Sequence, residues 1–196
     1  PRSAGKRPPR AKDSGHRAQH RISYFRTQPS VSACSMHIEI RLREQELWLL
    51  SERGIVRGYS VSTAKNGPGE MENSECTPRG WHAICEKIGA GCASGTVFIA
   101  RQPDGKVYVP EFRTLYQGKD WILTRILWLT GLQPAFNQGG SVDTKNRFIY
   151  IHGAPDDAAM GTPGSGGCIR MRNADVIDLF DRVEVGTRVL IRDDAL

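Results

Sequence analysis

The stretch from Tyr150 to Phe180, "YIHGAPDDAAMGTPGSGGCIRMRNADVIDLF", indicates both the fold and the chemistry of this chain. It contains one histidine, His152, sixteen residues before its one cysteine, Cys168. A thiol is a good nucleophile only as the thiolate, and a nearby imidazole can take its proton. The glycines before Cys168 permit tight turns, which would leave the N–H groups of Gly167 and Cys168 free to face a developing oxyanion. The spacing therefore predicts a cysteine nucleophile with a histidine base.

The order of these residues resembles the catalytic motif of the L,D-transpeptidase (YkuD-like) family. That motif is a histidine, a spacer and Ser/Thr-His-Gly-Cys, and this chain has Ser165-Gly166-Gly167-Cys168 after His152. Gly166 stands where the family has its second histidine. The resemblance implies that His152 deprotonates Cys168. The second histidine has a supporting role in the family, so Gly166 need not abolish activity.

The resemblance extends upstream and covers about Met36 to Ile191. "VSTAKNGPG" (Val61–Gly69) and "TPRGW" (Thr77–Trp81) are similar to the family's strand, loop and turn, and "ILTRILWLTGLQPAFNQGG" (Ile122–Gly140) to the segment before its histidine strand. It implies a mostly β fold of the sandwich or barrel-like L,D-transpeptidase type, with one helix after the cysteine.

The resemblance also implies a reaction on the peptide stem of bacterial peptidoglycan. The cysteine forms a thioester with the stem, D-alanine leaves, and an amine of a second stem completes a 3-3 cross-link. Water as acceptor would give an L,D-carboxypeptidase, and a protein amine is a further acceptor. The alternative that is not an enzyme is a non-catalytic homologue that binds the cell wall. No metal or organic cofactor is required.

Four residues are candidates for contacts with the substrate. Arg170 offers a guanidinium fork that suits a carboxylate, and a surface salt bridge is the alternative. Arg125 lies in an apolar run, where a charge needs either a substrate or a buried acid. Ser165 could donate its hydroxyl to the site or shape the turn. Tyr150 shares a strand face with His152 and could wall the site or pack in the core.

The basic character of the chain is concentrated in residues 1–35. The whole chain carries a formal charge of +6, and these residues hold eight Lys/Arg and one Asp, so the remainder has a net charge of −1. Their composition, rich in Arg, Pro and Ser, predicts a disordered extension before a catalytic domain at 36–196. Two interpretations stay open: attraction to nucleic acid or an anionic surface, and a solvated extension before a natural start at Met36.

The remaining cysteines and the location of the protein leave further alternatives. Cys76, Cys85 and Cys92 accompany His82, and zinc binding, a disulfide or simple burial would each account for them. No signal peptide and no membrane-spanning run is visible in the sequence. The resemblance nevertheless implies the periplasm or cell envelope, with a cytoplasmic role as the alternative.

Hydrophobic periodicity predicts the secondary structure. The residues around 121–130 fit either a helix or a buried strand. Asn173 is a good N-cap for a helix that ends by Gly186. The segment "QPDGK" (Gln102–Lys106) has the composition of a turn. The predicted strands are Met36–Leu42, Leu47–Leu50, Ile55–Ser62, Trp81–Ile88, Thr96–Arg101, Val107–Val109, Arg147–His152 and Arg188–Arg192.

Overall fold

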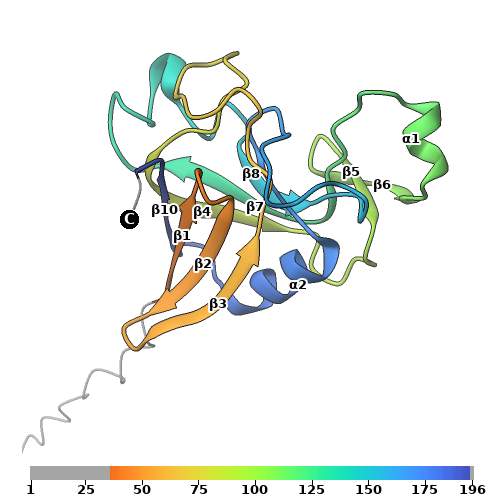
Figure 1. Ribbon diagram of the computed structural model, residues 1–196, viewed down its shortest axis with the longest axis horizontal. Helices are drawn as coiled ribbons and strands as arrows, with labels where there is room; N and C mark the ends of the chain where they lie inside the picture. Colours follow the sequence, from red (N-terminus) through yellow and green to blue (C-terminus); the bar gives the residue numbers. More distant parts are fainter. Residues whose placement is uncertain (1–35, 195–196) are drawn as a thin grey trace, which may run out of the picture. The chain divides into compact units, whose positions relative to one another are not determined.

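The computed structural model describes residues 36–194 (Figure 1). The predicted disordered extension at 1–35 lies outside the described residues. Among those described, no helix is both long and apolar enough to cross a membrane.

A single mixed β-sheet of ten strands forms the framework. Its main path runs in the order β3-β2-β1-β10-β4-β7-β5-β6, and β8 joins β7 to β9. The pairs β1–β10 and β8–β9 are parallel, and the other named pairs are antiparallel. The strands are β1 His37–Arg41, β2 Glu46–Ser51, β3 Gly54–Ser60, β4 Gly80–Ile88, β5 Thr96–Ile99, β6 Gln102–Val107, β7 Leu123–Gly131, β8 Tyr150–Gly153, β9 Ile169–Met171 and β10 Arg188–Arg192.

The main core collects the apolar side chains of distant strands into one cluster. Ile38 and Leu47 from the N-terminal hairpin meet Leu127, Ile151 and Ile169 from the second half of the chain. Strands carry alternate residues on opposite faces, so one face of each contributing strand supplies this core; β5 and β6 contribute no residue to it. Helix α2, Asn173–Arg182, adds its apolar stripe to the same cluster and lies beside the sheet (Figure 1).

The mostly β class is confirmed, and the position of the second helix is corrected. Residues Leu123–Gly131 form β7, whose side chains are almost all buried, so the helix considered near 121–130 is absent. A continuous apolar run fits a strand that is covered on both faces. The second α-helix is α1, Glu111–Leu115, which the sequence did not predict. A short 3-10 helix covers Gly140–Val142.

The turn between β5 and β6 lies earlier than predicted. Gln102–Val107 is a strand, and the turn consists of Ala100 and Arg101, whose φ angles are 47° and 69°. Two successive positive φ angles match the right-handed twist of a tight hairpin. The prediction placed the turn at Gln102–Lys106, which instead lies within β6, opposite an irregularity in β5.

Helix α2 begins one residue earlier than predicted, because Asn173, the predicted N-cap, is itself helical. Arg172 is its N-cap, with no capping hydrogen bond from a side chain, and Asn173 is the first helical residue. The Asn173 amide instead donates to Asp156 Oδ1 at 3.0 Å, and its carbonyl oxygen accepts from the Thr124 hydroxyl. The side chain thus ties α2 to β7 and to the loop after β8, and does not cap its own helix.

Candidate active site

The pairing of β8 with β9 brings the two principal candidates together on one sheet face. Ile151 is the register partner of Ile169, and both side chains point into the main core. Their neighbours therefore point to the opposite face. On that face Cys168 stands at the level of Tyr150, and His152 is one step further along the strand. The strand register thus places Cys168 and His152 at diagonal positions on one face of the sheet.

The segment that follows β3 holds the loop before Cys168 in place. The N–H groups of Gly164 and Ser165 both donate to the carbonyl of Thr63, at 2.8 and 2.9 Å. The N–H of Lys65 donates to Ser165 O at 3.0 Å. The segment Val61–Gly69, which resembles the family upstream of the cysteine motif, thus supports the loop that carries Cys168.

The turn at Thr77 supports the same loop from another side. The Thr77 hydroxyl donates to Gly167 O at 2.9 Å, and the Ala64 N–H donates to the Thr77 hydroxyl at 3.0 Å. Gly167 has a φ of 129°, and a Cβ there would lie 3.3 Å from Cys76 O. Only glycine adopts this conformation without strain.

The predicted oxyanion donor at Gly167 needs correction. Its N–H donates to the Ser165 hydroxyl at 3.2 Å and is therefore occupied. The N–H of Cys168 makes no hydrogen bond within residues 36–194. A second main-chain donor lies at the sulfur: the N–H of Tyr150 points to Cys168 Sγ at 3.4 Å. The sequence missed this group because a main-chain donor has no residue signature.

The environment of Cys168 favours the neutral thiol at rest. The side chain is partly buried and packs with Phe98, Ile126 and Tyr150. Its Sγ donates to Phe148 O at 3.4 Å. Burial raises the pKa of the thiol to about 12, although the Tyr150 N–H favours the thiolate. A thiolate therefore needs a base at the moment of reaction.

His152 has the properties of that base. It is fully buried, and Nδ1 lies 2.8 Å from Gly153 O. Because a carbonyl only accepts, Nδ1 must carry the hydrogen, which leaves a lone pair on Nε2. Nε2 is buried and has no hydrogen-bond partner within the described part of the chain. Burial also lowers the pKa of His152, so the imidazole is neutral and able to accept a proton.

Arg147 is a charged residue near the site that the sequence did not single out. Its guanidinium donates to Glu70 O and Cys76 O, both at 2.7 Å, and to Gly69 O at 3.1 Å. It thereby fixes the loop before the Thr77 turn. Its positive charge also lowers the pKa of the Cys168 thiol, against the larger effect of burial.

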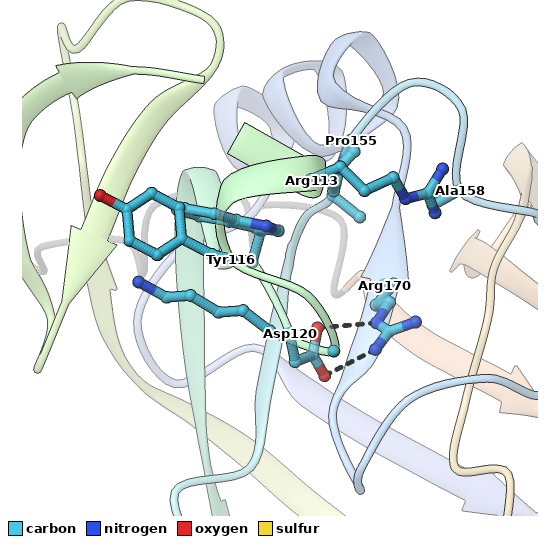
Figure 2. A pocket seen from close by; sticks show the side chains of 10 residues that line it. Arg113, Tyr116, Asp120, Pro155, Ala158 and Arg170 are labelled. Atoms are coloured by element: carbon cyan, nitrogen blue, oxygen red, sulfur yellow. Dashed lines mark hydrogen bonds and ion pairs between the residues drawn. The ribbon is translucent and has the colours of Figure 1, made fainter. Parts of the chain in front are cut away.

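Arg170 carries the salt bridge that the sequence left as an alternative to substrate binding. It forms two parallel bonds with Asp120, Nε to Oδ1 at 2.9 Å and Nη2 to Oδ2 at 2.8 Å (Figure 2). Asp120 lies between α1 and β7, in a sequence with no feature that would have revealed it. The charge of Asp120 also acts on the candidate site. It opposes the lowering of the pKa of His152 by burial, and it adds to the raising of the pKa of Cys168 by burial.

Ser165 and Tyr150 have structural contacts, which correct their assignment to the substrate. The Ser165 hydroxyl is buried and donates to Cys168 O at 2.5 Å, so it shapes the turn. Tyr150 is 4% exposed and its hydroxyl accepts from Arg101 at 3.1 Å. Its ring packs edge-on against Trp128. The core alternative for Tyr150 is the one observed.

Arg125 also differs from its predicted role. Its Nη1 donates to Cys92 O at 2.8 Å and to Thr124 O at 2.6 Å, and the guanidinium lies over the ring of Phe180. Phe180 belongs to α2 and the main core, away from the cluster that holds Cys168. No acidic partner of Arg125 occurs among residues 36–194. Main-chain carbonyls and an aromatic ring take the place of the expected acid or substrate.

The other cysteines and His82 form no joint site. Cys76, Cys85 and Cys92 are free thiols. His82 bonds to Gly80 O and to the Thr144 hydroxyl, and burial lowers its pKa to about 4. In the described range no group of three or more His, Cys, Asp or Glu side chains could hold a metal ion.

Comparison with known proteins matches this arrangement to one family. The L,D-transpeptidase catalytic domain model (YkuD) matches residues 35–191. The putative L,D-transpeptidase YqjB of Bacillus subtilis (strain 168) is 49% identical over 158 residues, which cover 81% of this chain and 72% of that protein. The probable L,D-transpeptidase ErfK/SrfK of Salmonella typhimurium is 34% identical over 118 residues, 60% of this chain and 33% of that protein.

Solved structures show the same fold. The L,D-transpeptidase of Xylanimonas cellulosilytica superposes with a TM-score of 0.51 at 21% identity, over 84% of this chain and 64% of that one. Bd1075 of Bdellovibrio bacteriovorus gives a TM-score of 0.51 at 16% identity, over 84% and 50%. At these identities the likeness concerns the fold alone. The family model, by contrast, spans most of the sequence, and on that ground the chain belongs to the L,D-transpeptidase catalytic domain (YkuD) family.

Proposed function

We propose that this protein is a peptidoglycan L,D-transpeptidase that acts through a thioester on Cys168. The observation that supports this most directly is the unpartnered Nε2 of His152, a buried lone pair on the sheet face that also carries the thiol. A buried acceptor without a partner is costly, so its retention favours a catalytic use. Family membership supports the substrate class.

In the acylation step, His152 Nε2 takes the thiol proton as Cys168 Sγ attacks the carbonyl of the third, diamino-acid residue of the stem. The S–C bond forms, and the negative charge moves to the carbonyl oxygen. The N–H of Cys168 is the main-chain donor available to that oxygen, while the N–H of Tyr150 donates to the sulfur. The C–N bond to D-alanine then breaks, and the leaving amine takes the proton from His152.

In the second step, the amine of another stem attacks the thioester carbonyl. It gives a proton to His152, the C–S bond breaks, and the thiol recovers its proton, so the catalyst is restored. Water in place of the amine would release a tripeptide, which is the carboxypeptidase alternative. Because the substrate is part of the cell wall, we propose that the protein acts at the cell envelope.

Gly166 leaves this chemistry without the second histidine of the family motif. A Cβ at Gly166 would meet no atom within 4 Å, so the position is open and contributes no polar group to the site. The proposed mechanism therefore assigns all proton transfer to His152. The pKa of the thiol, raised by burial, makes this base indispensable.

The test is a reaction with a tetrapeptide stem, followed by mass spectrometry of both protein and products. We expect an adduct on Cys168 with loss of D-alanine, and a cross-linked dimer when acceptor is present. Cys168→Ala should remove the adduct, whereas the matched thiol variant Cys85→Ala on β4 should retain it. A tripeptide product alone would identify a carboxypeptidase. Absence of any adduct would overturn the proposal and favour the wall-binding homologue.

A further inference from the structure

A cavity of about 310 Å³ lies beside the active site, on the side of Arg170. Figure 2 shows it between the segment that carries Asp120 and the loop that carries Pro155 and Ala158. Its charged lining consists of Arg113, Lys119 and Arg170, with Asp120 as the one carboxylate. Arg113 is paired with Asp157 and Arg170 with Asp120, so Lys119 is the lining cation without a carboxylate partner among the described residues, and its charge suits an anionic ligand.

The Asp120–Arg170 pair has the geometry of a guanidinium that holds a ligand carboxylate. Its two bonds, at 2.9 and 2.8 Å, engage both oxygens of the carboxylate. Such bidentate pairing is how arginine recognises carboxylates in general. The side chain of Arg170 is 19% exposed and that of Asp120 is 38% exposed, so solvent and ligands have access to the pair.

The two partners are anchored very differently. The main chain of Arg170 is bonded to Ser62 in both directions, at 2.9 and 3.0 Å, and belongs to the central pairing of the site. Asp120 lies in the connection between α1 and β7, whose aromatic side chains form a small cluster around Trp121, separate from the main core. The backbone that carries Arg170 is therefore a fixed part of the sheet, whereas Asp120 belongs to a connection outside it and is the partner that a ligand carboxylate can replace.

We propose that Asp120 is a specificity-determining residue that occupies the position of a substrate carboxylate on Arg170. The proposal rests on the proposed function, whose stem substrate carries several carboxylates. A ligand carboxylate can exchange with Asp120, because it restores the same charge and both hydrogen bonds. A neutral carboxamide cannot, because it would leave two charged groups without their bonds. Asp120 thus restricts the cavity to carboxylate-bearing ligands and weakens their binding by competition.

The test measures binding directly, in a Cys168→Ala background that prevents turnover. Calorimetry compares the tetrapeptide stem with the same peptide whose carboxylates are converted to carboxamides. We expect Asp120→Asn to increase the affinity for the stem about tenfold, which is the scale of one charge-assisted hydrogen bond. The affinity for the carboxamide peptide should stay unchanged. Asp193→Asn, an equal change of charge near the end of β10, is the matched control and should alter neither affinity.

The outcomes separate this inference from the proposed function. If Asp120→Asn weakens the stem, affects both peptides equally, or leaves both unchanged, the inference is wrong. Failure of every variant to bind the stem would also overturn it. Thermal unfolding of Asp120→Asn identifies a variant that merely loses structure. Because the binding is measured without the nucleophile, these results hold even if the wild-type protein forms no thioester, which would contradict the proposed function alone.

Discussion

At the scale of single residues, adjacent glycines in the motif have opposite constraints. Gly166 is exposed, and a Cβ there would meet no neighbour within 4 Å. Gly167 has a φ of 129°, and its Cβ would approach Cys76 O and Ile149 Cδ1 at 3.3 Å. The backbone would therefore accept another residue at position 166, whereas at position 167 its conformation requires glycine.

Substitution at the two glycines tests this contrast. We expect Gly166→His to change the free energy of unfolding by less than about 0.5 kcal/mol, because an exposed open position tolerates a side chain. Gly167→Ala should destabilise the protein by about 1 to 3 kcal/mol through backbone strain. Urea unfolding measures both. Equal effects of the two substitutions would contradict the conformational assignment.

The thiol of Cys168 should also report its environment. With a pKa of about 12, its thiolate fraction is small at neutral pH and rises with pH. The alkylation rate should therefore increase about tenfold per pH unit from pH 7 to 10, without a plateau. Peptide mapping after iodoacetamide treatment separates this cysteine from the others. A plateau near pH 8 would show that the thiol titrates in the ordinary range.

At the scale of elements, the buried histidine of β4 links the sheet to the loop before β8. Nδ1 of His82 donates to Gly80 O at 3.0 Å, Nε2 lies 3.1 Å from the Thr144 hydroxyl, and burial lowers the pKa of His82 from 6.5 to about 4. The unfolded chain therefore binds a proton at a higher pH than the folded chain does. The contribution of neutral, buried His82 to the free energy of unfolding is complete above pH 6.5 and is lost as the pH falls toward 4.

Replacement of His82 should reduce the loss of unfolding free energy that occurs as the pH falls below 6.5. Between pH 6.5 and 4 the wild type should lose about 3 kcal/mol through His82 alone. His82→Gln, which retains a hydrogen-bonding side chain without a titrating group, should lose less over that range. The comparison uses urea unfolding at several pH values. Parallel curves for the two proteins would show that His82 is not the titrating group.

The β5–β6 hairpin offers a second test at this scale. Ala100 has a φ of 47°, a conformation that asparagine adopts more readily than alanine. Ala100→Asn should therefore stabilise the protein by roughly 0.5 kcal/mol, on the scale of other turn-compatible substitutions. The midpoint of thermal unfolding measures this. A lower midpoint would indicate that the turn has a different conformation in solution.

At the scale of the whole molecule, charge divides the chain into two unequal parts. Residues 1–35 carry a net charge of +7, and residues 36–196 carry −1. Residues 36–196 should therefore show little attraction for polyanions. We expect the full chain to bind a cation exchanger at pH 7 and residues 36–196 to elute without retention. Retention of the shorter protein would show that residues 36–196 themselves carry a basic surface.

Much of the architecture could be predicted from local pattern. The alternation of apolar residues predicted β1, β4 and β10 almost to their ends, because a strand that is buried on one face must alternate. The helix after Cys168 followed from its apolar stripe. Patterns without alternation were ambiguous: the run at β7 is apolar throughout, and only burial on both faces decided that it is a strand.

The sequence by itself identified the candidate nucleophile and the candidate base, because Cys168 and His152 carry chemistry that few residue types provide. Tertiary structure alone decided what surrounds them. The N–H of Tyr150 at the sulfur and the pairing of Arg170 with Asp120 both arise from segments distant in the chain. Hydrogen bonds and ion pairs depend on distance and direction in space, and these are set only when the strands pair.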